Sequence, residues 1–464
     1  MSLLKRLKRL LSDRVTSPAY RVILATVSRN RWLVLLSFNS SLFSVFFEGS
    51  TFGIIFGALS VLGSDRLPDF QNNRITAFPP IYAFLSGMER GELFVFLILS
   101  AIGLQVARSG FRFMSMVASG YLAARVQVQM IERVFAQILS LSFPCSSRYK
   151  VGDLSSYVTT AGGTVKVQIT LWNSLLVNML TIFAYIAVVV SISIPLSAVA
   201  ILLAGGVAIV QSQLMPRIRR TSKRLTTKRV DVSKQLIESI QALRVIHTFA
   251  RQRATLQHMR RILQKLVPLL ERQTRLLSTL PPVSDIMSVT AIGGLLIAGF
   301  FLLDGEAQLV LPALITFIAA LNRLSTQVQS ISSTSNRLAD NIGQLERLNA
   351  ILAPEDKTFT RLGGNAFAAV RDEIEFDRVS LRYNPDDDEV LKEVSFRMKR
   401  GTMTALVGGS GAGKSSLADL LIGLYDPTAG AIRFDGVDMR EFDLESWRSH
   451  LGVVSQDTFI FNSS

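Results

Sequence analysis

Long stretches almost free of charged residues dominate the hydropathy pattern of the chain. The first runs from Leu33 to Leu62, where Glu48 is the single charged residue. A helix of about 20 apolar residues crosses the hydrocarbon core of a bilayer, so this run can span it with some tilt. Applied along the whole chain, the same criterion predicts six membrane-spanning helices, at residues 33–62, 93–119, 174–193, 196–214, 282–303 and 308–331.

Two of the connections between these spans are long and helical in pattern. Residues 120–173 join the second span to the third, and residues 215–281 join the fourth to the fifth. In the second of them, apolar residues recur at helical spacing with no Pro or Gly between them, at Val232, Leu236, Ile240, Leu243 and Ile246. Continuing each helix for about 30 residues at 1.5 Å per residue would carry the turns roughly 40 Å from the membrane. We therefore predict an α-helical membrane domain with long helical extensions.

The pattern changes near residue 353. Helical periodicity continues up to this point, so we assign residues 1–352 to the membrane domain, residues 353–370 to a linker and residues 371–464 to a soluble domain. Apolar and polar residues alternate at Glu373–Phe376 and Val390–Phe396, as they do in half-buried antiparallel strands. The soluble part is therefore predicted to begin with a small sheet.

A strand, a glycine-rich loop and a helix are predicted next in the soluble domain. The apolar segment Met403–Val407 precedes the loop, and an apolar helical run at Leu417–Leu424 follows it. This order is typical of an α/β nucleotide-binding domain.

Composition agrees with a membrane protein and limits the other classes. Hydrophobic residues make up 49% of the 464 residues and charged residues only 18%, with a mean hydropathy of +0.35, which excludes disordered, collagen-like and disulfide-scaffold proteins. The net charge is +15, but its Lys and Arg gather at residues 1–31 and 217–275, the pattern of segments retained in the cytoplasm. No nucleic-acid recognition motif accompanies the charge, so we expect no nucleic-acid partner. The single cysteine, Cys145, excludes an intrachain disulfide.

The glycine-rich loop fits the phosphate-binding pattern G-x-x-x-x-G-K-[ST] through Gly408, Gly413, Lys414 and Ser415. Glycines let backbone N–H groups close around phosphates at a helix N-terminus, the lysine reaches the β- and γ-phosphates, and the serine hydroxyl binds Mg²⁺. The pattern predicts ATP and Mg²⁺ as cofactors. The predicted phosphate-binding residues are Gly408, Gly409, Ser410, Gly411, Ala412, Gly413, Lys414, Ser415 and Ser416.

With six spans ahead of this motif, the chain resembles the ATP-binding cassette exporters of the lipid and multidrug flippase type. The resemblance covers nearly the whole chain. It implies that Tyr383 is the aromatic residue that stacks on adenine and that Gln456 is the amide that reaches Mg²⁺ or the attacking water. Ser455 stands where the family more often has Pro. Taken alone, Tyr383 could be an ordinary strand aromatic and Gln456 a surface loop residue.

The resemblance also implies partners and a place in the cell. It predicts a multi-pass protein, by default in a bacterial plasma membrane, with its N-terminus and nucleotide-binding domain in the cytoplasm. The partners expected are a second half-transporter, membrane lipid, and an amphipathic lipid, glycolipid or drug-like substrate. Gly152–Ser156 and Thr248–Arg253 look like the two regions that couple the membrane helices to the cassettes.

The family's later catalytic motifs do not occur in the sequence. No acidic strand end with a following glutamate, no signature loop and no switch histidine is found, and Asp435 is rejected as the acidic strand end because Gly436 continues a hairpin pattern. We therefore expect an incomplete nucleotide-binding domain, with Lys414 and Gln456 as its catalytic residues. This chain alone is expected to bind ATP without hydrolysing it.

Three other interpretations of the chain stay open. It could be a nucleotide-binding regulatory subunit that does not turn over ATP, a natural short form without ATPase activity, or a P-loop kinase tethered to a membrane. The last is disfavoured because a tether needs only one span.

Charged residues inside the spans supply the substrate hypothesis, because they are costly there and mark functional sites. Arg108 and Arg112 lie four residues apart, on one helical face, and could hold an anionic amphiphile in a cavity. Glu48, Asp285 and Arg323 could line the same cavity. Alternatively, the two arginines extend to the membrane interface, or Glu48 pairs with one of them structurally.

Overall fold

The computed structural model describes residues 17–63, 87–192, 231–279, 307–384 and 387–454, together with scattered residues within 216–229 and 282–297. The chain divides into two compact units. The first, which we call the helical unit, comprises Met1–Ile131 and Thr159–Asn349. The second, the sheet unit, comprises Glu132–Val158 and Ala350–Ser464.

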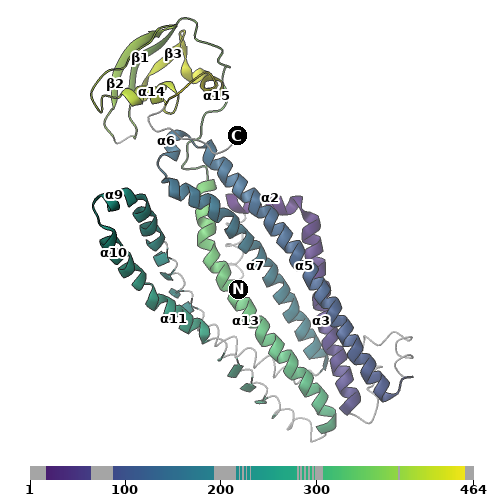
Figure 1. Cartoon of the computed structure of the whole chain (residues 1–464). Coiled ribbons are helices and arrows are strands. Elements are labelled where there is room, and N and C mark those ends of the chain that lie inside the picture. The colour runs from purple at the N-terminus through teal and green to yellow at the C-terminus, as the bar shows by residue number, and fades with distance from the viewer. Residues whose placement is uncertain are drawn as a thin grey trace, which may run out of the picture. The chain divides into compact units, whose positions relative to one another are not determined.

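Long helices make up most of the helical unit (Figure 1). In the part of the chain that the structure describes, three helices are long and apolar enough to cross a membrane, at Arg31–Val61, Arg90–Ser140 and Val151–Val188. The principal helices are α2 (Pro18–Arg29), α3 (Arg31–Gly63), α5 (Arg90–Ser140), α7 (Val151–Ile192) and α13 (Ala307–Leu352). The helical membrane region predicted from the sequence is confirmed.

The predicted spans can be placed on these helices in four cases. The first, second and sixth lie within α3, α5 and α13, and the third lies almost wholly within α7. The fourth lies outside the described residues, and only scattered residues of the fifth are described. Both α5 and α7 extend well beyond their spans, since α5 continues to Ser140 and α7 begins at Val151.

Hydrogen bonds between small polar side chains connect the long helices. The Ser41 hydroxyl of α3 lies 2.7 Å from that of Ser115 in α5. The Asn178 amide of α7 donates to Ser330 of α13 at 2.8 Å, and the buried Asn341 of α13 donates to Gln168 of α7 at 2.9 Å. Such contacts suit helices that pack in lipid, where no hydrophobic force separates helix faces from their surroundings.

The second long connection contains three short helices. These are α9 (Leu243–Thr248), α10 (Gln252–Gln264) and α11 (Val267–Ser278). Between α9 and α10 the chain turns at Ala250, whose φ of 51° is in the left-handed region. The turn lies inside Thr248–Arg253, the second region expected to couple membrane helices to a cassette.

A four-stranded antiparallel sheet forms the centre of the sheet unit. Its strands are β1 (Glu373–Leu381), β2 (Leu391–Lys399), β3 (Ala429–Phe434) and β4 (Val437–Asp438), in the order β2-β1-β3-β4. Three short helices accompany it: α14 (Lys414–Leu421), the 3-10 helix η2 (Met439–Glu441) and α15 (Leu444–Arg448). The core between sheet and helices includes Phe376, Val379, Leu420, Ile432, Phe434 and Trp447. The predicted partial nucleotide-binding domain is confirmed in outline.

The strand predicted at Met403–Val407 is wrong for this structure. The segment has no regular secondary structure, and the side chains of Met403 and Val407 are 98% and 93% exposed. A strand needs a hydrogen-bonded neighbour, and no strand of the described sheet pairs with this segment. The glycine loop therefore follows an extended segment rather than a paired strand.

The first long connection turns at residues 141–150, ahead of the Gly152–Ser156 segment expected there. The short helix α6 (Phe143–Ser146) lies in the turn, and Gly152–Ser156 belongs to the first turns of α7. Leu141 pairs with Phe359 of the linker in an isolated antiparallel bridge. The bridge fastens this connection to the linker within the sheet unit.

Candidate nucleotide site and membrane groove

The glycine-rich loop has the backbone conformation that its sequence requires. Gly411 and Gly413 have φ values of 84° and 83°, in the region that favours glycine. A Cβ on Gly413 would lie 2.6 Å from Cδ2 of Leu391, so the close approach to β2 also demands glycine. Helix α14 begins directly afterwards, and its first N–H groups have no acceptor within the helix. The loop thus combines free backbone donors with the positive end of a helix dipole.

Lys414 is the first residue of α14, and its ammonium lies over the loop. Its Nζ donates to the carbonyl oxygens of Gly408 at 2.9 Å and Gly409 at 2.7 Å. An ammonium carries three hydrogens, so a donor remains for a phosphate oxygen. The loop, the helix terminus and this cation fit a triphosphate.

Tyr383 lies next to the glycine loop rather than on an isolated strand face. It follows β1, and its hydroxyl lies 2.8 Å from the hydroxyl of Ser416, which is buried on α14. The Tyr383 ring also contacts the ring of Tyr425 edge to face, at a centroid distance of 4.9 Å. The structure therefore brings the proposed adenine-stacking residue to the helix that carries Lys414.

The metal ligands are only partly placed. Ser415 is exposed on the first turn of α14, whereas Gln456 lies outside the described residues. Among the residues that the structure describes, no three His, Cys, Asp or Glu side chains cluster as a metal site. Mg²⁺ typically keeps several waters and binds through few protein groups and substrate phosphates, so Ser415 is compatible with that role.

Helix α14 is held at its C-terminal end by α15, a feature the sequence did not reveal. The Trp447 indole donates to the carbonyl of Leu421 at 2.9 Å. The Arg448 guanidinium donates to the carbonyls of Ile422 at 3.1 Å and Gly423 at 2.8 Å, and burial lowers its pKa. These carbonyls have no acceptor role inside the helix, so both side chains cap it. The cap fixes the direction in which α14 presents Lys414.

Within the helical unit, Arg108 forms an ion pair instead of facing a cavity alone. Its Nη2 lies 2.6 Å from Oε1 of Glu48, and both side chains are nearly buried. The Tyr185 hydroxyl donates to the same carboxylate oxygen. Glu48 thus joins α3, α5 and α7, in agreement with the alternative in which it pairs structurally. Arg112 and Asp285 are exposed.

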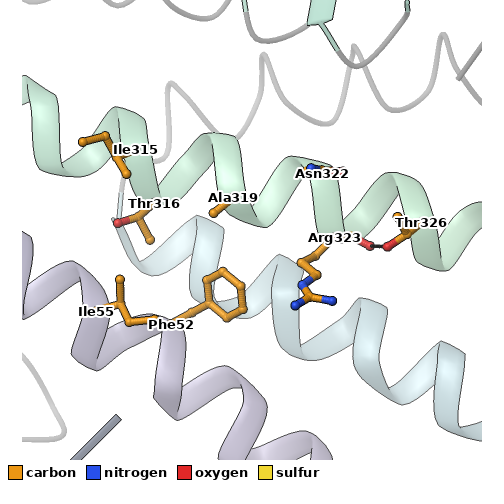
Figure 2. Close-up of a pocket in the computed structure, with 8 residues that line it drawn as sticks. All are labelled: Phe52, Ile55, Ile315, Thr316, Ala319, Asn322, Arg323 and Thr326. Carbon is orange, nitrogen blue, oxygen red and sulfur yellow. Dashed lines mark hydrogen bonds between the residues drawn. The ribbon is translucent and has the colours of Figure 1, made fainter. Parts of the chain in front are cut away.

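A groove of about 440 Å³ lies between α3 and α13 (Figure 2). Phe52 and Ile55 of α3 line one wall. The α13 wall is formed by residues that recur on one helical face, namely Ile315, Thr316, Ala319, Asn322, Arg323 and Thr326. Figure 2 shows the Phe52 ring and the Arg323 guanidinium turned into the space between the two helices. Of the charged residues proposed for the cavity, Arg323 is the one that lines this groove.

Comparison with known proteins covers both units. The ABC transporter transmembrane region model matches residues 32–333, and the ABC transporter model matches residues 391–464. The first match alone covers more than half of the 464 residues.

Three relatives illustrate the range of similar proteins. The chain is 27% identical over 454 residues to the heterocyst differentiation ATP-binding protein HepA of Nostoc, covering 96% of the chain and 72% of HepA. It is 25% identical to the putative multidrug export ATP-binding/permease protein YgaD of Bacillus subtilis, over 74% of the chain and 59% of YgaD. It is 29% identical to the ATP-dependent lipid A-core flippase of Methylococcus capsulatus, over 79% of the chain and 61% of that protein.

The chain thus spans between about three fifths and three quarters of the length of these relatives. A helical membrane region and a glycine loop ahead of α14 agree with both family matches. The chain belongs to the ABC transporter family.

Proposed function

We propose that this protein forms half of a two-chain exporter that uses ATP to move an anionic amphiphile across a membrane. The observation that carries the proposal is the groove between α3 and α13, which is apolar at one end and cationic at the other. Relatives described as lipid A-core flippases and as a multidrug export protein support this class of substrate.

The apolar end of the groove suits a hydrocarbon chain. Phe52, Ile55, Ile315 and Ala319 present aliphatic and aromatic surface from two helices. Burying such surface contributes about 25 cal/mol per Å², independent of the precise shape of the ligand. Ile315 and Ala319 are exposed on α13, so a ligand or a second chain has access to this wall.

The other end of the groove suits an anionic headgroup. Arg323 lies two helical turns beyond Ile315, about 12 Å along α13 at 1.5 Å per residue. Its guanidinium is exposed, and no carboxylate among the described residues forms an ion pair with it. Guanidinium binds phosphate or carboxylate in a bidentate way, and Asn322 and Thr326 add polar groups beside it. Arg108 is a poorer candidate because Glu48 already neutralises it.

ATP would bind through the sheet unit. The loop amides and Lys414 would surround the phosphates, Ser415 would meet Mg²⁺, and Tyr383 would stack on adenine. Gln456 would complete the metal and water contacts. Bound ATP supplies the free energy of its hydrolysis, while the chain's own contribution is electrostatic positioning of the phosphates.

The test measures lipid translocation in vesicles by the protein expressed from its native gene. We expect ATP-dependent movement of anionic lipid, a decrease of roughly tenfold for Arg323→Ala because a charge-assisted contact is lost, and partial recovery for Arg323→Lys. Lys414→Ala should abolish movement of every lipid. Arg112→Ala is the matched control, because it removes an exposed arginine from α5 and should have little effect.

Two results would contradict the proposal. Equal movement of anionic and zwitterionic lipid by Arg323→Ala and the unchanged protein would remove the headgroup site. Lipid movement that persists in Lys414→Ala would remove ATP as the energy source.

A further inference from the structure

Three aromatic rings connect the candidate nucleotide site to the first cytoplasmic connection, all within the sheet unit. The Tyr383 ring contacts Tyr425 at 4.9 Å between centroids, with an interplanar angle of 77°. The Tyr425 ring contacts Phe143 of α6 at 5.6 Å and 86°. Both contacts are edge to face, the geometry that aromatic pairs prefer. A side chain proposed to touch adenine is thus two ring contacts away from a helix in the turn between α5 and α7.

The Tyr383 end of this row is held by a second contact. Its hydroxyl lies 2.8 Å from that of Ser416, which is buried on α14. With its hydroxyl bonded to α14 and its ring against Tyr425, the direction of the ring plane is set by two neighbours. Moving Tyr425 therefore changes how Tyr383 presents its face.

The Phe143 end is held by the linker. The backbone N–H of Ser142 donates to the carbonyl of Thr358 at 3.0 Å, and that of Thr360 donates to Ser140 at 2.9 Å. The hydroxyls of Ser142 and Thr358 lie 2.6 Å apart. Because this short ladder fixes the residue directly before Phe143, the ring is attached to the start of α6 and to the linker together.

We propose that Tyr425 and Phe143 are positioning residues through which the first cytoplasmic connection senses the nucleobase. A base that stacks on Tyr383 favours one orientation of that ring, Tyr425 follows it, and Phe143 transmits the change to α6. Coupling between two sites is reciprocal, so a change at Phe143 must alter the affinity for the base. The inference rests on the proposed role of Tyr383 at adenine.

Binding of two ligands by the whole chain in detergent separates this role from general damage. ATP uses the loop and the base contact, whereas inorganic tripolyphosphate uses the loop alone. We expect Tyr425→Leu and Phe143→Leu each to weaken ATP binding roughly three- to tenfold, the worth of one aromatic contact. Tripolyphosphate binding should stay unchanged in both variants, and Tyr425→Phe should restore ATP binding.

Phe359→Leu serves as the matched control, since it removes a half-exposed ring from the linker next to α6 without touching the row. It should leave both affinities unchanged. Unchanged ATP affinity in Phe143→Leu, with a loss in Tyr383→Leu, would overturn the relay alone. Equal affinity for ATP in Tyr383→Leu and the unchanged chain would overturn its premise, and absence of any nucleotide binding would overturn the proposed function instead.

Discussion

At the scale of single residues, Asp435 shows how a carboxylate that resembles a catalytic acid serves the fold. It lies between β3 and β4 with φ at 51°, and its carboxylate accepts hydrogen bonds from the backbone N–H groups of Arg371, Asp372 and Glu373. These bonds, first that from Arg371, lower the pKa of the Asp435 carboxyl. Its place in a hairpin agrees with its rejection as the acidic strand end.

The lowered pKa of Asp435 gives a prediction with a definite sign. A carboxyl with a lower pKa in the folded state stabilises the fold above its unfolded pKa of about 3.9, and this stabilisation is lost as the pH falls through the folded value. Asp435→Asn keeps a side chain that tolerates positive φ and removes the charge. We expect it to cost about 1 kcal/mol at pH 7, because three charge-assisted bonds weaken, and to differ little from the unchanged chain below pH 4.

Hydrogen exchange at residues 371–373 measures this effect locally. Asp435→Ala is the companion variant, and it should lose more protection than Asp435→Asn because it removes the acceptor as well as the charge. A difference between unchanged chain and Asp435→Asn that does not depend on pH would contradict the role of the charge.

At the scale of helices, Glu48 is the contact on which α3, α5 and α7 converge. Arg108 and Tyr185 both donate to it, and the side chains of Glu48 and Arg108 are 6% and 11% exposed. Removing one member of a buried ion pair leaves the other without its partner, at a cost of about 3–5 kcal/mol. We expect Glu48→Leu and Arg108→Met each to lower thermal stability of the solubilised protein strongly.

The double variant distinguishes the ion pair from simple loss of packing. Glu48→Leu with Arg108→Met leaves no unpaired charge, so it should be more stable than either single variant, by at least about 1 kcal/mol of coupling. Additive losses would show that the two side chains act independently. Glu92→Gln, an exposed change near the start of α5, is the control and should have no effect.

The same helices show why spans are easier to predict than their contacts. Lipid demands a long apolar run from each crossing helix, and that requirement is visible in Leu33–Leu62 without knowledge of any neighbour. The pairing of Glu48 with Arg108 depends on which helix faces which, so the sequence left it as one of several alternatives. Arg323, Arg108 and Arg112 looked equivalent by hydropathy, and only packing separated them.

The sheet unit shows the same limit for strands and caps. The glycine loop was found because its residues are adjacent and their spacing carries the mechanism. The strand at Met403–Val407 failed because strand formation depends on a partner elsewhere in the chain. Trp447, Arg448 and Tyr425 carry no local signal, since each acts on a residue that the fold alone brings close.

At the scale of the whole molecule, the division into two units makes the turn between α5 and α7 part of the sheet unit. Residues 132–158 group with the linker and the sheet, although hydropathy assigns them to the membrane domain. Bonds between Ser142 and Thr358 and the bridge between Leu141 and Phe359 account for this grouping. If the unit moves as one body, the turn and the linker stay together during transport.

A disulfide between residues 142 and 358 tests that expectation. The hydroxyls of Ser142 and Thr358 lie 2.6 Å apart on paired backbone, so Ser142→Cys with Thr358→Cys should form the bond on mild oxidation. The native Cys145 is buried and would be replaced by Ala in all variants. Because the bond joins two segments of one unit, we expect ATP affinity and ATP-driven transport to be the same before and after oxidation. Each single-cysteine variant is the control for oxidation itself; transport that stops on oxidation and returns on reduction only in the double variant would mean that the turn leaves the linker during each cycle.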